Sequence, residues 1–496
     1  MSDRPNILVI LTDQHNPHVL GCYGNRIVRT PNLDRLAGEG MRFANTYCPA
    51  PWCVPSRMSF LTSRTPTHNR VWTNSHILNS GRVTWAHVLG AAGYETVLIG
   101  RMHFDGPDQR HGFERRIGGE HDNSHPGAPG LGGPMWTRYP PITCGQDRET
   151  VEIAGRGTTH YQWMDQQRTR AAVEFLRDRA RHPSDRPFAA VLGYMLPHCP
   201  FISPKDLFNY YYDKVDIPPV EASQPATVTR FRRLRRILEP LSEERVRVAR
   251  TAYFGLCEHI DSLVGRVLEG LDAMGPANNT LVVYTSDHGE AAGEHGCWWK
   301  SNYYQASASV PMIARLPGTV PAGRTCEAVC NLIDLGPTFA QIAGATFDPQ
   351  PDGRSLWPTL QGSHPRDWVD ETFCEFADSR DALTPSRMIR QGPWKLWHHA
   401  FDGEHTMAGS PPALFNLDDD PGELRDRSPD PACAAVRDRL MRRLYEDWDP
   451  QRIAAEAADG EASYRAIARW GRAVRPDDPD RLDVPPPGYE DDVELL

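Results

Sequence analysis

The chain has 496 residues, 40% of them hydrophobic and 24% charged, so it can bury a large core and form one large domain plus a smaller one. Its formal net charge of -10 argues against a nucleic-acid groove or an anionic membrane surface as the main partner, because bulk repulsion would oppose both. The first apolar run, residues 7–11, is too short for a signal segment or a membrane span, so we expect a cytoplasmic protein.

The first two thirds of the chain alternate apolar runs, bounded by turn residues, with amphipathic stretches. This alternation is typical of an α/β protein in which helices cover both faces of a sheet. The predicted strands are residues 6–11, 95–100, 188–194 and 281–285. The predicted helices are residues 31–40, 55–63, 83–92, 158–182 and 242–274. Pro55 suits the first turn of its helix, where its missing N–H costs nothing.

Two later changes in pattern suggest domain boundaries. Residues 118–156 are rich in Gly and Pro and predict a long irregular insertion in the catalytic domain, which we assign to residues 1–365. Shorter segments follow, including residues 388–398 and 413–417 and a helix at 434–448. They predict a smaller C-terminal α+β domain over residues 366–473. The acidic, Pro-rich tail, residues 474–496, buries little alone and is predicted to clasp a neighbouring subunit in a homo-oligomer, a dimer or tetramer.

The eleven cysteines are an odd number without paired spacing, so they predict free thiols rather than a disulfide framework. Cys326 and Cys330 have the spacing of a metal-binding pair. No second pair lies nearby, however, so packing is the simpler interpretation for both.

Acidic residues follow two of the predicted strands. Asp13 and Gln14 come directly after the strand that ends at Leu11, and Asp287 and His288 follow the strand at 281–285, inside TSDHGE. In open α/β sheets, ligands bind beyond the carboxyl ends of the strands. The four side chains could therefore converge on one divalent cation, although each pair alone could equally be a helix cap or a turn.

The segment CVPSR, residues 53–57, is the most specific motif. A thiol at a helix N-terminus faces the positive end of the helix dipole, and Arg57, one turn later, can face the same anion. The alternative is a buried thiol beside a prolyl turn. The motif instead favours Cys53 as a nucleophile.

CVPSR resembles the signature of the sulfatase family in the alkaline phosphatase superfamily, in which this cysteine is oxidised to formylglycine. NILVILTDQ, TPNLDRLAGEGMRF and LFNLDDDPGELRD are similar to other segments of the family. GRMHFDGPDQRHGFE resembles the choline-sulfatase branch, and the Asp-Gln and Asp-His pairs also occur in phosphonate monoester hydrolases. The resemblance implies an alkaline-phosphatase-like α/β fold, with a large mixed sheet between helices and a smaller C-terminal α+β domain.

The resemblance also implies roles for individual residues. Residue 53, as formylglycine, would be the nucleophile and a metal ligand. The remaining metal ligands would be Asp13, Gln14, Asp287 and His288. Arg57 would hold the formylglycine hydrate, Arg101 and Lys300 the sulfate oxygens, His198 would assist departure of the alcohol, and His103 would assist collapse of the intermediate. A formylglycine-generating enzyme would be the maturation partner.

Three positions depart from the commonest pattern of the family. Gln14 replaces an aspartate and removes one negative charge from the metal shell. His288 replaces the frequent asparagine, and its nitrogen shifts the balance from Ca²⁺ toward Mn²⁺, so both ions stay open. Arg101 stands where many relatives have lysine. Its guanidinium keeps the positive charge but presents a wider, forked set of N–H donors.

The function implied is hydrolysis of a sulfate monoester, and two alternatives remain. A phosphonate monoester or phosphodiester hydrolase would use the same nucleophile, but Arg101 and His103 make the site more cationic and favour sulfate. A non-catalytic anion-binding relative is the other alternative. The sequence does not identify the alcohol part of the substrate. Recognition of choline would need an aromatic cage for its quaternary ammonium. Candidate pocket residues are Trp136, Tyr139, Trp163, Asn74, His76 and Trp298.

Overall fold

The centre of the molecule is an eight-stranded sheet with the strand order β10-β2-β9-β8-β1-β6-β3-β4. The computed structural model describes residues 4–119, 126, 146–274, 279–363, 365–380, 383–400, 409–476, 489 and 492–496. Strand β9 runs antiparallel to β8 and β2, whereas the other pairings are parallel, so the sheet is mixed. The strands are β1 (Asn6–Asp13), β2 (Met41–Tyr47), β3 (Glu95–Gly100), β4 (Arg115–Ile117), β6 (Phe188–Pro197), β8 (Thr280–Ser286), β9 (Met312–Arg315) and β10 (Arg324–Asn331).

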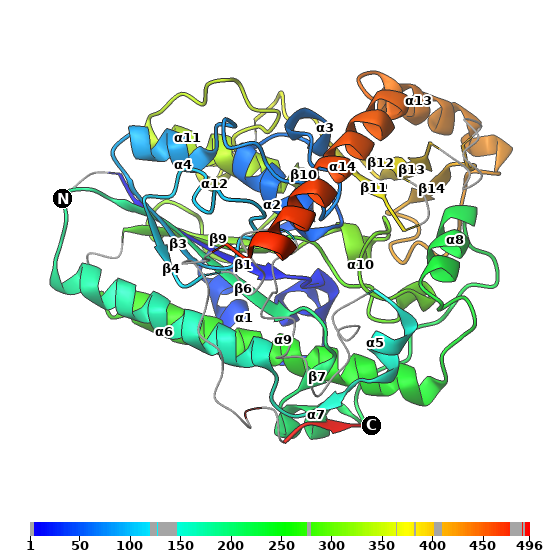
Figure 1. The fold of residues 1–496 in the computed structure, drawn as a ribbon, viewed down its shortest axis with the longest axis horizontal. Coiled ribbons are helices and arrows are strands. Elements are labelled where there is room, and N and C mark those ends of the chain that lie inside the picture. The colour runs from blue at the N-terminus through cyan, green and yellow to red at the C-terminus, as the bar shows by residue number, and fades with distance from the viewer. Residues whose placement is uncertain are drawn as a thin grey trace.

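Helices cover both faces of this sheet, as Figure 1 shows. Alternate residues of β1 point to opposite faces: Val9 joins a core with α2, α4 and α11, whereas Ile10 joins a second core with α1, α6 and α9. The helices are α1 (Pro31–Gly38), α2 (Cys53–Thr62), α3 (Pro66–Asn69), α4 (Trp85–Ala91), α6 (His160–Arg181), α7 (Lys205–Tyr211), α8 (Ala226–Leu234), α9 (Glu243–Asp272), α10 (Gln305–Ala308), α11 (Leu335–Ala343) and α12 (Trp357–Leu360). Two covered faces explain why the central strands are continuous apolar runs.

A second, antiparallel sheet lies in the C-terminal part of the chain. Its strands, in spatial order, are β11 (Glu371–Asp378), β12 (Thr384–Gln391), β13 (Trp394–His399) and β14 (Ala413–Asn416). One face, with Ile389 and Leu396, packs on α13 (Ala434–Tyr445) and α14 (Pro450–Val474), while Met388 and Trp397 on the other face join the core of the catalytic part. Together with the central sheet, this confirms the predicted α/β fold with a smaller C-terminal α+β domain.

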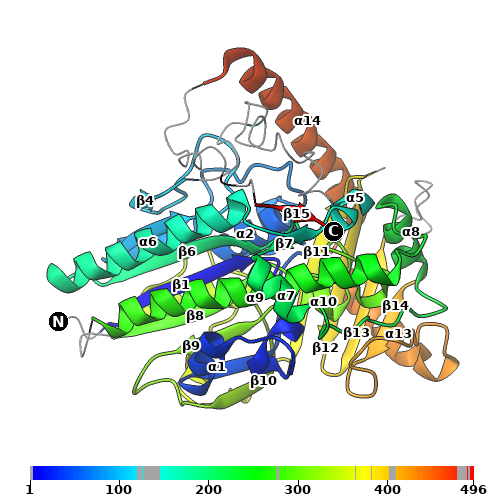
Figure 2. The same cartoon turned by 90° about the horizontal axis from the view of Figure 1, so that it is seen from below.

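The end of the chain returns to the first part of the molecule. Strand β15 (Glu494–Leu495) pairs with β5 (Gly155–Arg156), which pairs with β7 (Ile202–Ser203), near α5 (Arg148–Glu152). Figure 2 shows β15 beside β7 and α5. The described end of the tail thus lies on its own chain. The intersubunit role and the boundaries at residues 365 and 473 stay predictions, as does most of the irregular insertion, because residues 120–125 and 127–145 lie outside the described residues.

One predicted segment of the C-terminal part has the wrong bounds. Residues 388–398 are not one element but parts of β12 and β13, which form a hairpin around Gly392. Gly392 has a φ of 54°, a conformation that glycine adopts without strain and that reverses the chain. The QGP sequence at 391–393 was the turn signal.

The described cysteines are all free thiols, as the sequence predicted. Cys326 and Cys330 lie on β10 and are buried, and the Sγ atom of Cys330 lies 3.2 Å from the hydroxyl oxygen of Thr46. They pack in the core. Within the described ranges, no helix combines the length and the apolar composition needed to cross a membrane.

Candidate active site

The predicted site residues meet at one edge of the central sheet. Strands β8, β1, β6 and β3 are consecutive neighbours that run parallel, so their carboxyl ends lie side by side. Asp13 ends β1, and Asp287, His198 and Arg101 directly follow β8, β6 and β3. Gly193 on β6 lets the backbone of Arg101 pass close by, because a Cβ atom at residue 193 would lie 1.6 Å from the carbonyl oxygen of Arg101.

Helix α2 brings Cys53 to the same edge from above the sheet. All ten residues of α2 are buried, and its first turn is tied to its surroundings by two hydrogen bonds. The Val54 N–H donates to Oδ1 of Asn74 at 3.0 Å, and the Ser56 hydroxyl donates to the carbonyl oxygen of Asp287 at 2.5 Å. The N-terminus of α2 is thereby fixed against the end of β8.

Four side chains form a cluster suited to a cation: Asp13, Cys53, Asp287 and His288 offer ligand atoms that all lie within 4.8 Å of one another. The Nδ1 atom of His288 lies 3.0 Å from the carbonyl oxygen of Gly289, so Nδ1–H donates there and Nε2 presents its lone pair to the cluster. Nε2 lies 3.1 Å from the Cys53 Sγ atom and 3.6 Å from Oδ1 of both Asp13 and Asp287.

This donor set fits a divalent cation. Burial lowers the pKa of His288, so its imidazole is neutral at pH 7. A neutral nitrogen lone pair that faces two carboxylate oxygens is unfavourable unless a proton donor or a cation lies between them. Two oxygens, one nitrogen and the atom on residue 53 are donors that suit Mn²⁺ better than Ca²⁺, which prefers oxygen alone.

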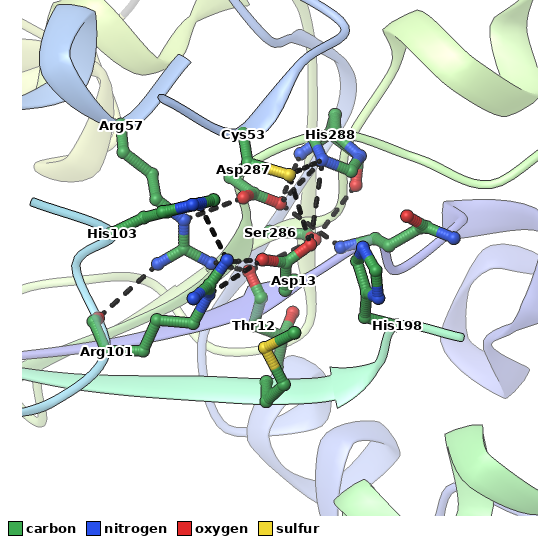
Figure 3. A network of polar contacts seen from close by, with 12 residues as sticks. Thr12, Asp13, Cys53, Arg57, Arg101, His103, His198, Ser286, Asp287 and His288 are labelled. Carbon is green, nitrogen blue, oxygen red and sulfur yellow. Dashed lines mark hydrogen bonds and ion pairs between the residues drawn. The ribbon is translucent and has the colours of Figure 1, made fainter. Parts of the chain in front are cut away.

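Cationic side chains surround the carboxylates of the cluster (Figure 3). Arg57 Nε lies 2.7 Å from Oδ2 of Asp287, and Arg57 Nη2 lies 3.1 Å from Oδ2 of Asp13. Arg101 Nε contacts the same Asp13 oxygen at 3.0 Å. Burial alone would raise the pKa of Asp13, but the neighbouring cationic side chains override it and hold this pKa well below its usual range. Asp13 is therefore ionised and can act as a ligand.

The two predicted acid–base histidines lie on opposite sides of Asp13 in Figure 3. His103 Nδ1 lies 2.6 Å from Nη2 of Arg101, and burial and this arginine hold the pKa of His103 well below its usual range. His198 Nδ1 lies 2.6 Å from the carbonyl oxygen of Cys199, and its Nε2 lies 2.8 Å from Nζ of Lys300. Burial, followed by the charge of Lys300, lowers the pKa of His198. His198 Nε2 therefore accepts a hydrogen bond from the Lys300 ammonium.

Gln14 has a different arrangement from the other predicted ligands. Its side-chain oxygen accepts a hydrogen bond from Lys300 Nζ, and its side-chain nitrogen donates to Oε2 of Glu290. Its backbone N–H donates to Oδ1 of Asp287 at 3.1 Å. Whether Gln14 is also a metal ligand stays a prediction.

The remaining candidate pocket residues differ in their surroundings. Asn74 holds the first turn of α2, as described above. His76 accepts from the Trp72 N–H at 3.1 Å and contacts the Ala457 carbonyl oxygen at 3.1 Å, and Trp298 packs on Phe201, so both have structural contacts. Trp163 stacks on His160. Trp136 and Tyr139 lie outside the described residues.

Sequence reasoning missed Glu290, which contacts Gln14 and is fully buried. Burial raises the pKa of Glu290 to about 7. The available signal was its position, two residues after His288 at the end of a predicted strand. The resemblance to the family implies a role only for the first acid of TSDHGE.

Comparisons with known proteins identify the family of the chain. The sulfatase family matches residues 5–345, and the C-terminal family of N-sulphoglucosamine sulphohydrolase matches residues 293–449. A choline-sulfatase of Rhizobium meliloti is 31% identical over 94% of this chain and 90% of its own length. Mouse iduronate 2-sulfatase is 31% identical over 80% of each chain.

The fold is also similar to a solved phosphonate monoester hydrolase from Agrobacterium radiobacter. The TM-score is 0.71 at 25% identity, and the match covers 94% of this chain and 96% of that one. The family match spans well over half of the chain and includes most of the residues gathered at the sheet edge. The predicted resemblance is thus confirmed, and the chain belongs to the sulfatase family and is a sulfuric ester hydrolase.

Proposed function

We propose that this protein hydrolyses a sulfate monoester to an alcohol or phenol and sulfate, with a formylglycine made from Cys53 as nucleophile. The observation that carries the proposal is the position of the Cys53 Sγ atom. It lies 3.1 Å from Nε2 of His288 and 3.8 Å from Oδ1 of Asp13, at a helix N-terminus and among buried cations. A site that only packed a thiol would have no reason to bury this many charges, because each costs desolvation.

The cationic residues would bind the sulfuryl group and stabilise its developing charge. Lys300 is buried, and the nearby Cys53 and Asp13 outweigh burial and raise its pKa, so it stays an ammonium. Arg57 and Arg101 are permanently charged. Fixed hydrogen-bond donors stabilise negative charge far more strongly in a water-poor site than in bulk water. This supports Arg101 and Lys300 as the residues that bind the sulfate oxygens, and Arg57 as the residue that binds modified residue 53.

The histidines would move the protons. His198 Nε2 accepts a hydrogen bond from the Lys300 ammonium, so a proton given up by Lys300 would pass through Nε2 to the departing alcohol oxygen. His103 is held on the other side of Asp13 by Arg101, and burial and this arginine lower its pKa, so its imidazole is neutral, the state in which it would accept a proton. A formylglycine hydrate offers two hydroxyls on one carbon, one to attack sulfur and one whose deprotonation allows sulfate to leave.

We further propose that one divalent cation is held by Asp13, Asp287, His288 and residue 53, with Gln14 as a further ligand. When bound, it supplies Lewis-acid stabilisation of negative charge on the sulfuryl oxygens. The nitrogen of His288 favours Mn²⁺ over Ca²⁺. The protein would need a formylglycine-generating enzyme for maturation, and we propose a homo-oligomer.

A second candidate function is hydrolysis of a phosphonate monoester or phosphodiester. The structural similarity to the hydrolase from Agrobacterium radiobacter favours it, and such substrates also carry one negative charge on a tetrahedral centre. The match to the sulfatase family and the similarity to a choline-sulfatase favour the sulfate monoester.

The test is a paired turnover assay. The protein is co-expressed with a formylglycine-generating enzyme, loaded with Mn²⁺, and given an aryl sulfate and an aryl phosphonate monoester with the same phenol. The proposal predicts a higher kcat/KM for the sulfate. A higher value for the phosphonate would assign the second function, and no turnover of either ester would support a non-catalytic anion-binding protein. Cys53→Ala is the control for contaminating hydrolases.

A further inference from the structure

Glu290 is a fully buried carboxylate that links two parts of the site. Its Oε2 atom accepts a hydrogen bond from the side-chain nitrogen of Gln14, at the end of β1. Its Oε1 atom accepts from the backbone N–H of Ala292 at 2.8 Å and of Trp299 at 2.6 Å. Trp299 immediately precedes Lys300. Glu290 therefore connects the end of β1 with the loop that carries Lys300.

The side-chain amide of Gln14 can satisfy both of its neighbours in only one orientation. The Gln14 oxygen accepts from Lys300 Nζ, and an ammonium can only donate. Glu290 accepts from three N–H groups, which is the pattern of a carboxylate. An amide between a donor and an acceptor has one satisfied orientation, with its oxygen toward Lys300 and its nitrogen toward Glu290.

The backbone of Gln14 cannot swing to relieve a mismatch. It has a φ of 71°, and its N–H donates to Oδ1 of Asp287. Its carbonyl oxygen accepts from the hydroxyl of Tyr253 at 2.8 Å. A change of polarity at Glu290 is thus transmitted through the side-chain amide.

We propose that Glu290 is a positioning residue, which orients the Gln14 amide so that its oxygen holds Lys300 beside His198. The chain of contacts runs from Glu290 through Gln14 and Lys300 to Nε2 of His198. The importance of this arrangement rests on the proposed function, in which Lys300 binds sulfate and His198 delivers a proton. The alternative is that Glu290 only holds the loop through the N–H groups of Ala292 and Trp299.

Glu290→Gln separates these roles. The new side chain keeps its size and can still accept from the two backbone N–H groups through its oxygen. Its NH₂ group, however, now faces the NH₂ group of Gln14, so the Gln14 amide must turn its nitrogen toward the Lys300 ammonium. The pair Gln14→Glu with Glu290→Gln restores the match, because a carboxylate at 14 accepts from both neighbours and the total charge is unchanged.

The matched control is Glu294→Gln, on the same loop. The Glu294 carboxylate pairs with His18 rather than with Gln14, with Oε2 3.7 Å from Nδ1. We would measure kcat and KM with an aryl sulfate, the affinity for inorganic sulfate by calorimetry, and the urea midpoint of unfolding for all variants.

We expect Glu290→Gln to weaken sulfate binding and kcat/KM by roughly 10- to 100-fold, as for other residues that orient a site, and the double variant to recover most of this loss. Glu294→Gln should stay within about twofold, as expected of a change outside such an orienting network. Sulfate affinity of Glu290→Gln equal to that of the control, or no recovery in the double variant, would overturn the proposal.

The urea midpoints keep the two proposals apart. If the wild-type protein neither binds sulfate nor hydrolyses the ester, the proposed function fails. The pairing of Glu290 with Gln14 is still tested, since it requires a lower midpoint for Glu290→Gln and recovery in the double variant. Equal midpoints for the single and double variants would then reject the positioning role as well.

Discussion

Two buried clusters of charged side chains in this molecule differ in how their charges are paired. In the cluster at the sheet edge, Asp13 and Asp287 share Arg57, and the lone pair of His288 faces both carboxylates at 3.6 Å. In the C-terminal part, Lys395 and Glu423 are equally buried but form a simple pair.

The Lys395 pair joins the C-terminal sheet to helix α10. Lys395 Nζ also donates to Oε1 of Gln305 at 3.0 Å, and Glu423 Oε2 accepts from the Gln305 N–H, at the start of α10, at 2.6 Å. Burial lowers the pKa of Lys395 to about 8. The Lys395 pair is matched in charge, whereas the first cluster gathers ligand atoms that could hold a cation. Changes in the first cluster should affect activity and metal-dependent stability, whereas changes in the second should affect the stability of the fold alone.

The largest effect is expected for Cys53→Ala. It removes the proposed nucleophile and should lower kcat for an aryl sulfate by roughly 10⁴- to 10⁶-fold, as in enzymes with a covalent intermediate. Urea unfolding should change by only about 1 kcal/mol, since a single small side chain is lost. Retained activity would show that another group attacks sulfur.

Lys395→Met should be the most destabilising of these changes, because it leaves the Glu423 carboxylate buried without its cation. We expect a loss of about 3–5 kcal/mol in the free energy of unfolding, measured by urea titration. Lys205→Met is the control, since Lys205 pairs with Glu494 at the surface and should cost about 0–1 kcal/mol. Equal costs for both would refute the structural role.

Removal of the metal should destabilise the protein through the first cluster. A cation that binds only the folded state adds about 2.7 kcal/mol at a hundredfold excess over its Kd. Chelated protein should therefore unfold at a lower temperature than protein with Mn²⁺, and Asp287→Asn should remove most of the difference. An unfolding temperature that does not respond to Mn²⁺ or Ca²⁺ would contradict a metal site.

The smallest effect concerns a half-exposed pair, His68 and Asp352, whose Nδ1 and Oδ2 atoms lie 2.6 Å apart. The hydrogen bond to Asp352 outweighs burial and raises the pKa of His68. The pair therefore stabilises the fold fully below the unfolded pKa of about 6.5, and this stabilisation disappears as pH rises through the folded pKa. Because the His68 side chain is 48% exposed, solvent screening limits it to about 0.5 kcal/mol.

The measurement compares the unfolding free energy of wild type with that of His68→Gln at about pH 5.5 and about pH 8.5, on either side of the histidine titration. The difference should be larger at the lower pH. Asp352→Asn should abolish the pH dependence of this difference. A difference that grows toward high pH would contradict the assigned sign.

Much of the core could be predicted because its strands are long apolar runs. The strands 6–11, 95–100, 188–194 and 281–285 correspond to β1, β3, β6 and β8, and the long helices 158–182 and 242–274 to α6 and α9. The same strands carry the site. The rule that ligands bind beyond the carboxyl ends of strands therefore predicted that Asp13 and Asp287 lie together.

Other elements could not be predicted, for identifiable reasons. Strand β2 (MRFANTY) and helix α14 lack strong apolar patterns, and α14 buries mainly small residues such as Ala457 and Ala468. The polarity of the Gln14 amide depends on Glu290 and Lys300, which approach it from other parts of the chain. No local pattern encodes such a contact.

The most direct test of the central claim is the mass of the tryptic peptide 43–57 from protein co-expressed with a formylglycine-generating enzyme and active on an aryl sulfate. The proposed mechanism predicts that residue 53 has lost its sulfur and two hydrogens and gained one oxygen, and that the activity rises with the modified fraction. Full activity in a preparation whose residue 53 is entirely cysteine would contradict it.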